Sequence, residues 1–356
     1  MNKIYLILIF LFFIACDESS NSSYAPLNPN CNASNPFEDA TGSCCNYEDV
    51  DCNGICFGTM VDDACNVCGG DSSSCDLGGC NDPEASNYNE TSSDNNNCIY
   101  DAIDEGWTWV WGDEFNTSSL DLYKWDYQLG TGSQYGMVGW GNNELQYYTN
   151  EPANLFFDTC DNDKQCLVIS GFRQTYESSE YTSARIRSAG SGIRTYGRID
   201  VRAKLPTAQG TWPAIWMLPE DMIYGGWPSS GEIDIMEHVG CDLGSIHGSI
   251  HCDSYNHIDG TEQTSSINNV AVDQFHIYRI DWDAEGIKWY VDDVLYNEFS
   301  NENSGSSSWP FDQDFYIILN LAIGGTWGGF CGVDSESLSL PQKMEIDYVR
   351  FFQKDN

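Results

Sequence analysis

Between residues 106 and 352 the sequence is built from many short segments in which apolar and polar residues alternate. Alternation with a period of two is typical of β-strands with one buried face, and Gly, Asn, Asp and Pro separate the segments as turns require. The clearest runs are residues 197–205, 275–282, 287–291, 315–320 and 344–350. No long amphipathic helix stands out. A stretch of roughly 250 residues with this pattern predicts one large all-β sandwich rather than two domains.

The first fifteen residues have the pattern of an export signal. Lys3 precedes an apolar run over residues 4–15, which is too short to span a bilayer comfortably and is typical of a signal peptide. The run ends in Ala15-Cys16, which resembles a bacterial lipobox and predicts lipidation of Cys16. The alternative is an ordinary secretory signal with an incidental cysteine. We therefore expect an exported bacterial lipoprotein of the outer membrane or cell surface, held to the membrane by its lipid anchor, or otherwise a secreted protein.

Three regions follow the signal peptide. Residues 16–43 are predicted to be a polar tether, residues 44–100 a cysteine-rich module, and residues 105–354 the sandwich domain. The module is too poor in apolar residues to fold on a core, so we expect its cysteines to form disulfides. Cys65 and Cys68 have the spacing of zinc ligands, but an exported region with many cysteines and no histidine favours disulfides. Its Asp and Asn side chains show no ordered calcium-loop pattern.

Five further cysteines lie in the sandwich region. Cys160 with Cys166 and Cys241 with Cys252 are the expected local pairs, which would leave Cys331 over. Connectivity does not follow from sequence, so these pairs are predictions that the fold must test.

The formal net charge is −39. Nucleic acid and anionic lipid surfaces would be repelled by it, so we expect neither as a partner, and sulfated polymers are disfavoured as substrates. The alternative interpretation is that the acidity serves solubility and says nothing about the ligand.

Three carboxylates occur on one predicted strand, in the segment Gly-Glu-Ile-Asp-Ile-Met-Glu-His of residues 231–238. Side chains of a strand alternate between faces, so Glu232 and Asp234 share a face while Glu237, an odd step away, would point to the other. A β-bulge between Asp234 and Glu237 would bring all three acids to one face and leave Ile233 and Ile235 for the core. Two carboxyl groups about 5–5.5 Å apart can act as nucleophile and acid/base on a glycosidic bond. We assign these roles to Glu232 and Glu237, with Asp234 as a hydrogen-bonding neighbour.

Aromatic residues surround this motif in the sequence. In residues 210–219, alternation puts Trp212 and Trp216 on one face and Ile215 and Met217 on the other, so one face is predicted to be core and the other a platform. Indole rings stack on the C–H faces of sugar rings, which gives an open cleft affinity without charge. Two tryptophans at this spacing are often simply core. Beside the carboxylates, however, they suggest a sugar platform to which Trp227 adds a wall.

The segment of residues 247–251 places His247 and His251 on one face. A metal interpretation needs a third ligand, for which His257 is the nearest candidate, but it falls in a predicted loop. We expect His251 instead to hydrogen-bond the substrate or the carboxylates, and we expect no cofactor for catalysis.

Taken together, these motifs resemble glycoside hydrolase family 16, and within it the laminarinase-like members. The resemblance covers about residues 107–353 and rests on residues 140–149, 212–217, 231–238, 247–251 and 318–325. It implies a concanavalin A-like β-jelly roll with glucan lying in a concave groove. It also implies the roles given above for Glu232, Asp234 and Glu237.

Further residues carry over through the resemblance alone. It implies that Asn142, Arg187, Trp212, Trp216 and His251 line the substrate subsites. It further implies a structural calcium ion at two acids near the paired terminal strands, Glu114 and Asp347, for which a core role is equally consistent with the sequence.

The spacing of Asp234 and Glu237 resembles laminarinases and agarases, and the flanking segments favour a laminarinase. We therefore expect a monomeric endo-1,3-β-glucanase whose partner is a polysaccharide. Mixed-linkage β-glucanase and agarase activities are alternatives, since such differences reside in loops. A non-catalytic surface glucan-binding lipoprotein is another, although both glutamates are present here.

Overall fold

The computed structural model describes residues 106–161, 164–188 and 190–354, together with residues 37–38, 43–45, 55–56, 59, 85 and 88. The chain divides into two compact units, Met1–Gly79 and Cys80–Asn356, which we describe separately. In the first unit β1 (Phe37–Glu38) pairs antiparallel with β2 (Cys44–Cys45), and Cys56 is disulfide-bonded. The predicted signal peptide, Cys16 and most of the predicted tether and cysteine-rich module lie outside the described residues.

Ten strands of the second unit form one sheet. In spatial order they are β17 (Val294–Ser300), β16 (Gly286–Val291), β15 (His276–Trp282), β10 (Gly197–Lys204), β19 (Gln342–Lys354), β7 (Gln165–Tyr176), β8 (Ser179–Ser183) and β5 (Gln146–Tyr148), with β3 (Trp107–Asp113) paired to β19 and β6 (Leu155–Thr159) paired to β7. Neighbouring strands are antiparallel except for the parallel pair β5 and β8.

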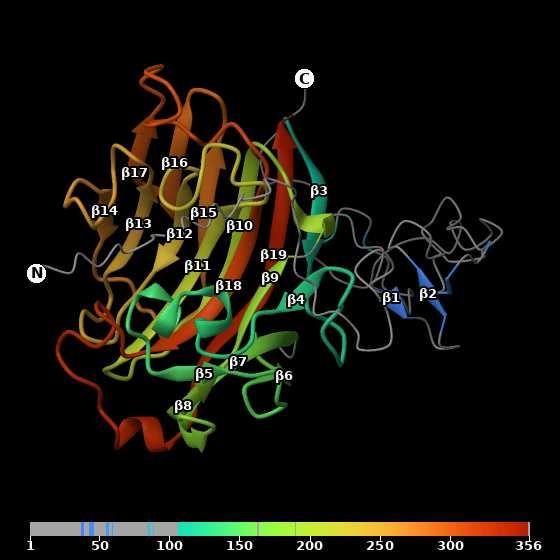
Figure 1. The fold of residues 1–356 in the computed structure, drawn as a ribbon, viewed down its shortest axis with the longest axis vertical. Coiled ribbons are helices and arrows are strands. Elements are labelled where there is room, and N and C mark those ends of the chain that lie inside the picture. The colour runs from blue at the N-terminus through green and yellow to red at the C-terminus, as the bar shows by residue number, and fades with distance from the viewer. Residues whose placement is uncertain are drawn as a thin grey trace, which may run out of the picture. The chain divides into compact units, whose positions relative to one another are not determined.

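Seven strands form the second sheet, which lies against the first (Figure 1). Their order is β14 (Gln263–Ile267), β13 (Ile246–His251), β12 (Glu232–Glu237), β11 (Thr211–Pro219), β18 (Phe315–Ile323), β9 (Arg185–Ser188) and β4 (Trp125–Tyr127), all antiparallel. The helical elements of the described residues are short 3₁₀ turns: η3 (Ser133–Tyr135), η4 (Val138–Gly141), η6 (Gly190–Gly192) and η7 (Ser337–Ser339). In this part of the chain, no helix has the length and apolar character needed to cross a membrane.

The core lies between the two sheets and consists of the residues that alternate inward on each strand. On β11, Ile215 and Met217 are at most 1% exposed, whereas Trp212 and Trp216 on the opposite face are half-buried. The predicted all-β sandwich is confirmed, and so is the division of β11 into a core face and an outer face. That outer face is available to line a cleft.

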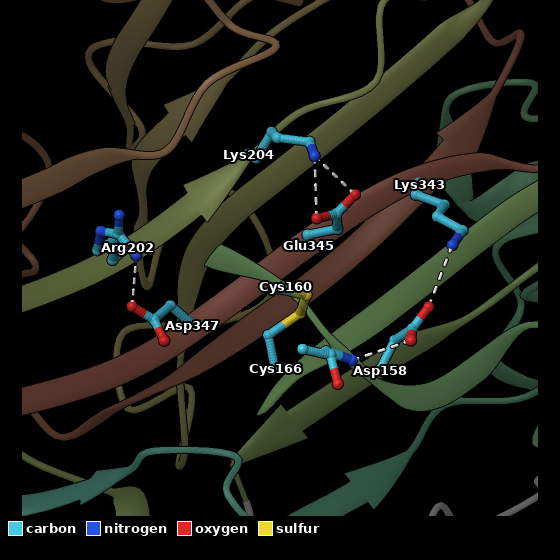
Figure 2. Close-up of a disulfide and its surroundings, with 9 residues drawn as sticks. Asp158, Cys160, Cys166, Arg202, Lys204, Lys343, Glu345 and Asp347 are labelled. Carbon is cyan, nitrogen blue, oxygen red and sulfur yellow. Dashed lines mark hydrogen bonds and ion pairs between the residues drawn. A yellow bond between two sulfur atoms is a disulfide. The ribbon is translucent and has the colours of Figure 1, made fainter. Parts of the chain in front are cut away.

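The ten-stranded sheet carries a disulfide and a group of ion pairs on its surface. Cys160 and Cys166 join the end of β6 to the start of β7, as predicted (Figure 2). Three ion pairs lie around it: Lys204 with Glu345 at 2.9 Å, Arg202 with Asp347 at 2.6 Å and Lys343 with Asp158 at 3.5 Å. The first two join β10 to β19 and the third joins β19 to β6, so opposite charges tie neighbouring strands together.

The other predicted disulfide is wrong. Cys241 pairs with Cys331, and Cys252 is a free, buried thiol. The reason lies in the hairpin of β12 and β13: Cys241 is in its turn, whereas Cys252 follows the far end of β13. A six-residue strand extends roughly 20 Å, so nearness in sequence places these two cysteines at opposite ends of the hairpin.

Candidate active site

The strand β12 carries the carboxylate motif and lies between β11 and β13. Asp234 and Glu237 pair with residues of β13 that are two positions apart, so Ile235 and Met236 together oppose the single residue Gly248. Two residues against one is a β-bulge. The pairing with β11 shifts register at the same place. The predicted bulge is therefore confirmed.

The bulge sorts the side chains of β12 between the two faces. Ile233, Ile235 and Met236 belong to the core and are at most 1% exposed. The acids lie on the other face, where the Nε2 of His251 is 3.7 Å from Glu232 and 3.3 Å from Asp234. His251 thus lies beside the carboxylates as expected, but the predicted hydrogen bond to them is not formed.

Each glutamate accepts a hydrogen bond from an indole. Trp227 donates from Nε1 to Oε2 of Glu232 at 3.0 Å, and Trp212 donates from Nε1 to Oε1 of Glu237 at 3.1 Å. Trp212 comes from the neighbouring strand β11, and Trp227 from the loop that precedes β12. These bonds fix the direction of both carboxyl groups. The two tryptophans therefore border the acids directly, as the sequence predicts.

The electrostatic surroundings keep protons on the acids. Burial raises the pKa of Glu232, of Asp234 and of Glu237 to about 8 in each case. The charge of Asp234 raises the pKa of the two glutamates further, whereas His251 lowers both. Three carboxyl groups this close do not all ionise together, so the group titrates as a unit and holds a proton at neutral pH.

The face continues from β11 across β18 to β9. The Nε1 of Trp216 donates to Oδ1 of Asn320 on β18 at 2.7 Å, and the guanidinium of Arg185 on β9 lies 4.7 Å from the centre of the Trp216 ring. The same guanidinium lies 4.3 Å from the ring of Trp140. Arg185 is 4% exposed, so the cation packs between the two indoles. The sequence analysis missed Arg185 and singled out Arg187.

Arg187 lies two residues further along β9, on the same face. Its guanidinium is 3.4 Å from Asp126 and stacks over the ring of Tyr316 at 5.3 Å. It is half-buried, at the margin of the face away from the acids. Asn142 follows η4, and its carbonyl accepts from the backbone N–H of Thr326 at 2.7 Å, which ties its loop to the one after β18. Within the part of the chain that the structure describes, no hydrogen bond or ion pair joins either residue to Glu232, Asp234 or Glu237.

A buried hydrogen-bond chain supports Trp216 from below. Asn320 donates from Nδ2 to the hydroxyl of Tyr148 at 3.1 Å, and this hydroxyl donates to Oε2 of Glu144 at 3.1 Å. Gln146 donates to the same oxygen at 2.6 Å. Burial raises the pKa of Glu144. Glu144, Gln146 and Tyr148 alternate within the motif of residues 140–149, whereas Asn320 and Trp216 lie far away in sequence, so no local pattern predicts their connection.

Trp327 is a further residue that the sequence analysis missed. Its ring meets Trp212 edge-on at 5.6 Å and His247 at 5.0 Å. It lies in the loop after β18, which the disulfide Cys241–Cys331 joins to the turn between β12 and β13. A sequence feature could have indicated Trp327, because the segment Gly-Gly-Thr-Trp-Gly-Gly begins where the motif of residues 318–325 ends.

Two groups among the described residues bring potential metal ligands within 4.8 Å of one another: Glu232 with Asp234 and His251, and Cys160 with Cys166 and Glu345. The sulfur atoms of the second group already form a disulfide. The first group includes neither of the other two histidines considered from sequence. His247 instead packs on Trp327, and His257 packs on Trp227 at 5.2 Å.

The predicted calcium ligands are engaged with arginines. Both oxygens of Glu114 accept hydrogen bonds from Arg350, at 2.9 and 2.8 Å, and Asp347 accepts one from Arg202 at 2.6 Å. A calcium ion bound here would lie against guanidinium groups, which its charge disfavours. As they lie, these side chains do not fit a shared calcium site, and the calcium stays a prediction.

A two-sheet sandwich whose outer face sets carboxyl groups among indole rings defines a protein that hydrolyses glycosidic bonds. Comparison with known sequences makes the assignment specific. A model described as "Glycosyl hydrolases family 16" matches residues 134–350. The chain belongs to this family, as its motifs predict, and is a glycoside hydrolase.

Individual relatives cover the same region. A β-glucanase of Rhodothermus marinus is 46% identical over 259 residues, which is 69% of this chain and 85% of the relative. The solved structure of the laminarinase from Rhodothermus marinus superposes with a TM-score of 0.65 at 45% identity, covering 70% of this chain and 98% of that one. A non-specific endo-β-1,3(4)-glucanase superposes with a TM-score of 0.64 at 42% identity, covering 71% and 93%.

Proposed function

We propose that this protein is a retaining, endo-acting hydrolase of β-1,3-glucan. The observation that carries the proposal is the bulge in β12, which puts Glu232 and Glu237 on the same face of the seven-stranded sheet. The similarity to a laminarinase and a β-glucanase supports the substrate class. Without the bulge Glu237 would point into the core, and two-carboxylate chemistry would be lost.

In the first step, ionised Glu232 attacks the anomeric carbon, and protonated Glu237 gives its proton to the departing glycosidic oxygen. The bond to the leaving sugar breaks as an ester to Glu232 forms. In the second step, Glu237, now a carboxylate, removes a proton from water. The resulting hydroxide attacks the anomeric carbon and releases Glu232, so two inversions retain the configuration.

Asp234 is suited to hold protons on the two glutamates. It lies between them in sequence, and its charge disfavours ionisation of both. His251 stands 3.3 Å from Asp234 and 3.7 Å from Glu232, and it opposes this effect by lowering the pKa of both glutamates. In this proposal the pair adjusts the protons of the glutamates and does not itself attack the substrate.

The surrounding side chains suit a neutral polysaccharide. Trp212, Trp216, Trp227 and Trp327 offer ring faces and edges, which bind sugar C–H groups. The cation of Arg185, which lies beside Trp216, is packed between indoles. Asn142 and Arg187 lie on the margins of the same region and are proposed to contact sugars further from the cleaved bond. A polysaccharide that binds along several of these residues is cleaved within its chain rather than at its end.

Mixed-linkage glucan is the second candidate substrate. The observation that favours it is the similarity, at 42% identity, to an endo-β-1,3(4)-glucanase described as non-specific. A strictly non-catalytic role is less consistent with the site, since both glutamates are present and each accepts an indole N–H.

Reducing-sugar release from laminarin, lichenan, agarose and xyloglucan tests the proposal. We expect rapid oligosaccharide production from laminarin that Glu232→Gln and Glu237→Gln each reduce by at least about a thousandfold, because each removes a reacting group. Glu298→Gln, an exposed residue of β17, is the matched control and should keep full activity. Binding of laminarin without release from any polymer would place the protein among glucan-binding proteins instead.

We further propose that the protein is exported as a monomeric lipoprotein anchored through Cys16, on the sequence pattern of residues 1–16. Metabolic labelling with a palmitate analogue tests this: the wild type should carry the label and Cys16→Ser should not. An unlabelled wild type in the medium would indicate simple secretion.

A further inference from the structure

The bulge in β12 is met from the opposite sheet by residues of β16 and β17. The indole N–H of Trp289 on β16 donates to the main-chain carbonyl of Asp234 at 2.8 Å. Trp289 is fully buried, so this donor has no access to water. The bond ends at the residue where the register of β12 shifts. It therefore joins the core of the ten-stranded sheet to the backbone that carries the acids.

The residue opposite the bulge is held from the same side. Asn297 on β17 donates from Nδ2 to the carbonyl of Gly248 at 2.9 Å. A Cβ atom on Gly248 would lie 2.5 Å from Cδ1 of Trp289 and 2.6 Å from the hydroxyl of Tyr296, distances that no real Cβ contact shows. A glycine is therefore required where these two side chains press against β13.

The supporting strands carry an irregularity of their own at this place. The pairing of β16 with β17 shifts register beside Trp289, so that Tyr296 is the extra residue. Burial and the charges of Glu237 and Asp234 raise the pKa of Tyr296, which keeps its hydroxyl neutral. Two irregular strand pairs thus face each other across the core.

We propose that Trp289 and Asn297 are positioning residues for Glu237. They donate hydrogen bonds to two backbone carbonyls, that of Asp234 at the start of the bulge and that of Gly248 opposite it. A strand can be regular or bulged, and this difference decides to which face of the sheet the side chain of Glu237 points. In this account the hydrogen bond from Trp289 stabilises the bulged form of β12 and determines how far the bulge protrudes. The distance from Glu237 to Glu232 therefore depends on a residue of the opposite sheet.

This inference rests on the proposed function, and the test separates the two. Trp289→Phe keeps the aromatic packing and removes the N–H. Trp282→Phe is a matched control: Trp282 is also fully buried, and its Nε1 donates to the carbonyl of Phe311 at 3.0 Å, outside the active site. Both variants lose one buried indole-to-carbonyl bond, so a purely structural role predicts equal effects.

We expect Trp289→Phe to lower kcat on laminarin about tenfold with KM within about twofold, because a misplaced acid/base slows chemistry without weakening binding. Trp282→Phe should leave kcat within about twofold of the wild type. It should lower Tm by about as much as Trp289→Phe does. If Trp289→Phe does not fold, Asn297→Ala carries the same comparison, with a kcat loss of about threefold expected. A kcat loss no greater than that of the control overturns the inference.

Amide hydrogen exchange gives a readout that does not depend on turnover. The amides of Ile235 and Met236 should exchange faster in Trp289→Phe than in Trp282→Phe. If the wild type released no sugar from any polymer, the proposed function would fail and this comparison would decide the inference. Faster exchange at the bulge would support it, and equal rates would overturn it.

Discussion

The indole of Trp227 donates to Oε2 of Glu232, five residues further along the chain, at 3.0 Å, so the loop before β12 and the strand itself jointly fix the proposed nucleophile. The bond favours the charged form of Glu232, which opposes the effect of burial on its pKa.

Removing this donor should shift the acid limb of the pH profile. Trp227→Phe raises the pKa of Glu232, so the carboxylate needed for attack forms at higher pH and the acid limb of kcat/KM moves upward. At pH 6 we expect a loss of about tenfold. Trp216→Phe is the control, because its indole donates to Asn320 instead. That variant should raise KM and leave the limb in place.

Asp234→Asn should shift the whole profile in the other direction. The charge of Asp234 raises the pKa of both glutamates, so a neutral amide lowers both values. Glu237 then loses its proton at lower pH, and the alkaline limb of kcat/KM moves downward together with the acid limb. Initial rates on laminarin between pH 4 and 10 measure this. If the acid and alkaline limbs of kcat/KM stayed at the same pH, Asp234 would not influence the protonation of the two glutamates.

Glu237→Gln should stabilise the fold in alkaline solution. Burial raises the pKa of Glu237 from 4.5 to about 8, so the folded protein favours the neutral acid. The stability from this preference is full below pH 4.5 and is lost as the pH rises through 8. The amide is neutral throughout, so the variant should gain a few kcal/mol at pH 9, with about 5 kcal/mol as the upper bound, and its Tm should rise accordingly. At pH 4 its Tm should match that of the wild type.

Cys331→Ser should free the loop that carries Trp327. The disulfide with Cys241 spans 90 residues, so its loss should cost about 4–5 kcal/mol. We expect KM for laminarin to rise several-fold, because Trp327 no longer holds its place against Trp212. Cys166→Ser is the control: its disulfide spans 6 residues on the other sheet, so the loss should be about 2 kcal/mol with unchanged KM. Equal KM in both variants would argue against a role for this loop in binding.

The features of the site that follow from alternation could be predicted from the sequence. Ile233 and Ile235 must lie in the core, so the acids must lie opposite them, and the odd step to Glu237 requires a bulge. The two faces of β11 follow by the same reasoning. These are local consequences of strand geometry, and they can be worked out without knowing which strands lie next to one another in the sheet.

Features that depend on which strands become neighbours could not be predicted in this way. Cys331 meets Cys241 because β18 and β12 both flank β11. Arg185 packs on Trp216 although the registers of β9, β18 and β11 set Arg187 level with this ring, so the contact depends on how the side chains pack. Trp289 belongs to a different sheet from Asp234, 55 residues away. Contacts of this kind follow from sheet order and packing, which no short segment encodes.

The ion pairs that tie β10, β19 and β6 together use a type of residue that this chain has in short supply. The sequence contains 15 lysines and arginines against 54 aspartates and glutamates, so most of its carboxylates have no basic side chain to face. In dilute buffer these charges repel one another across the surface, while at 1 M salt the Debye length falls to about 3 Å. Dissolved cations thus reduce the repulsion between the carboxylates of this surface, as lysine side chains do in other proteins. We therefore expect the fold to be more stable in brine than in fresh water.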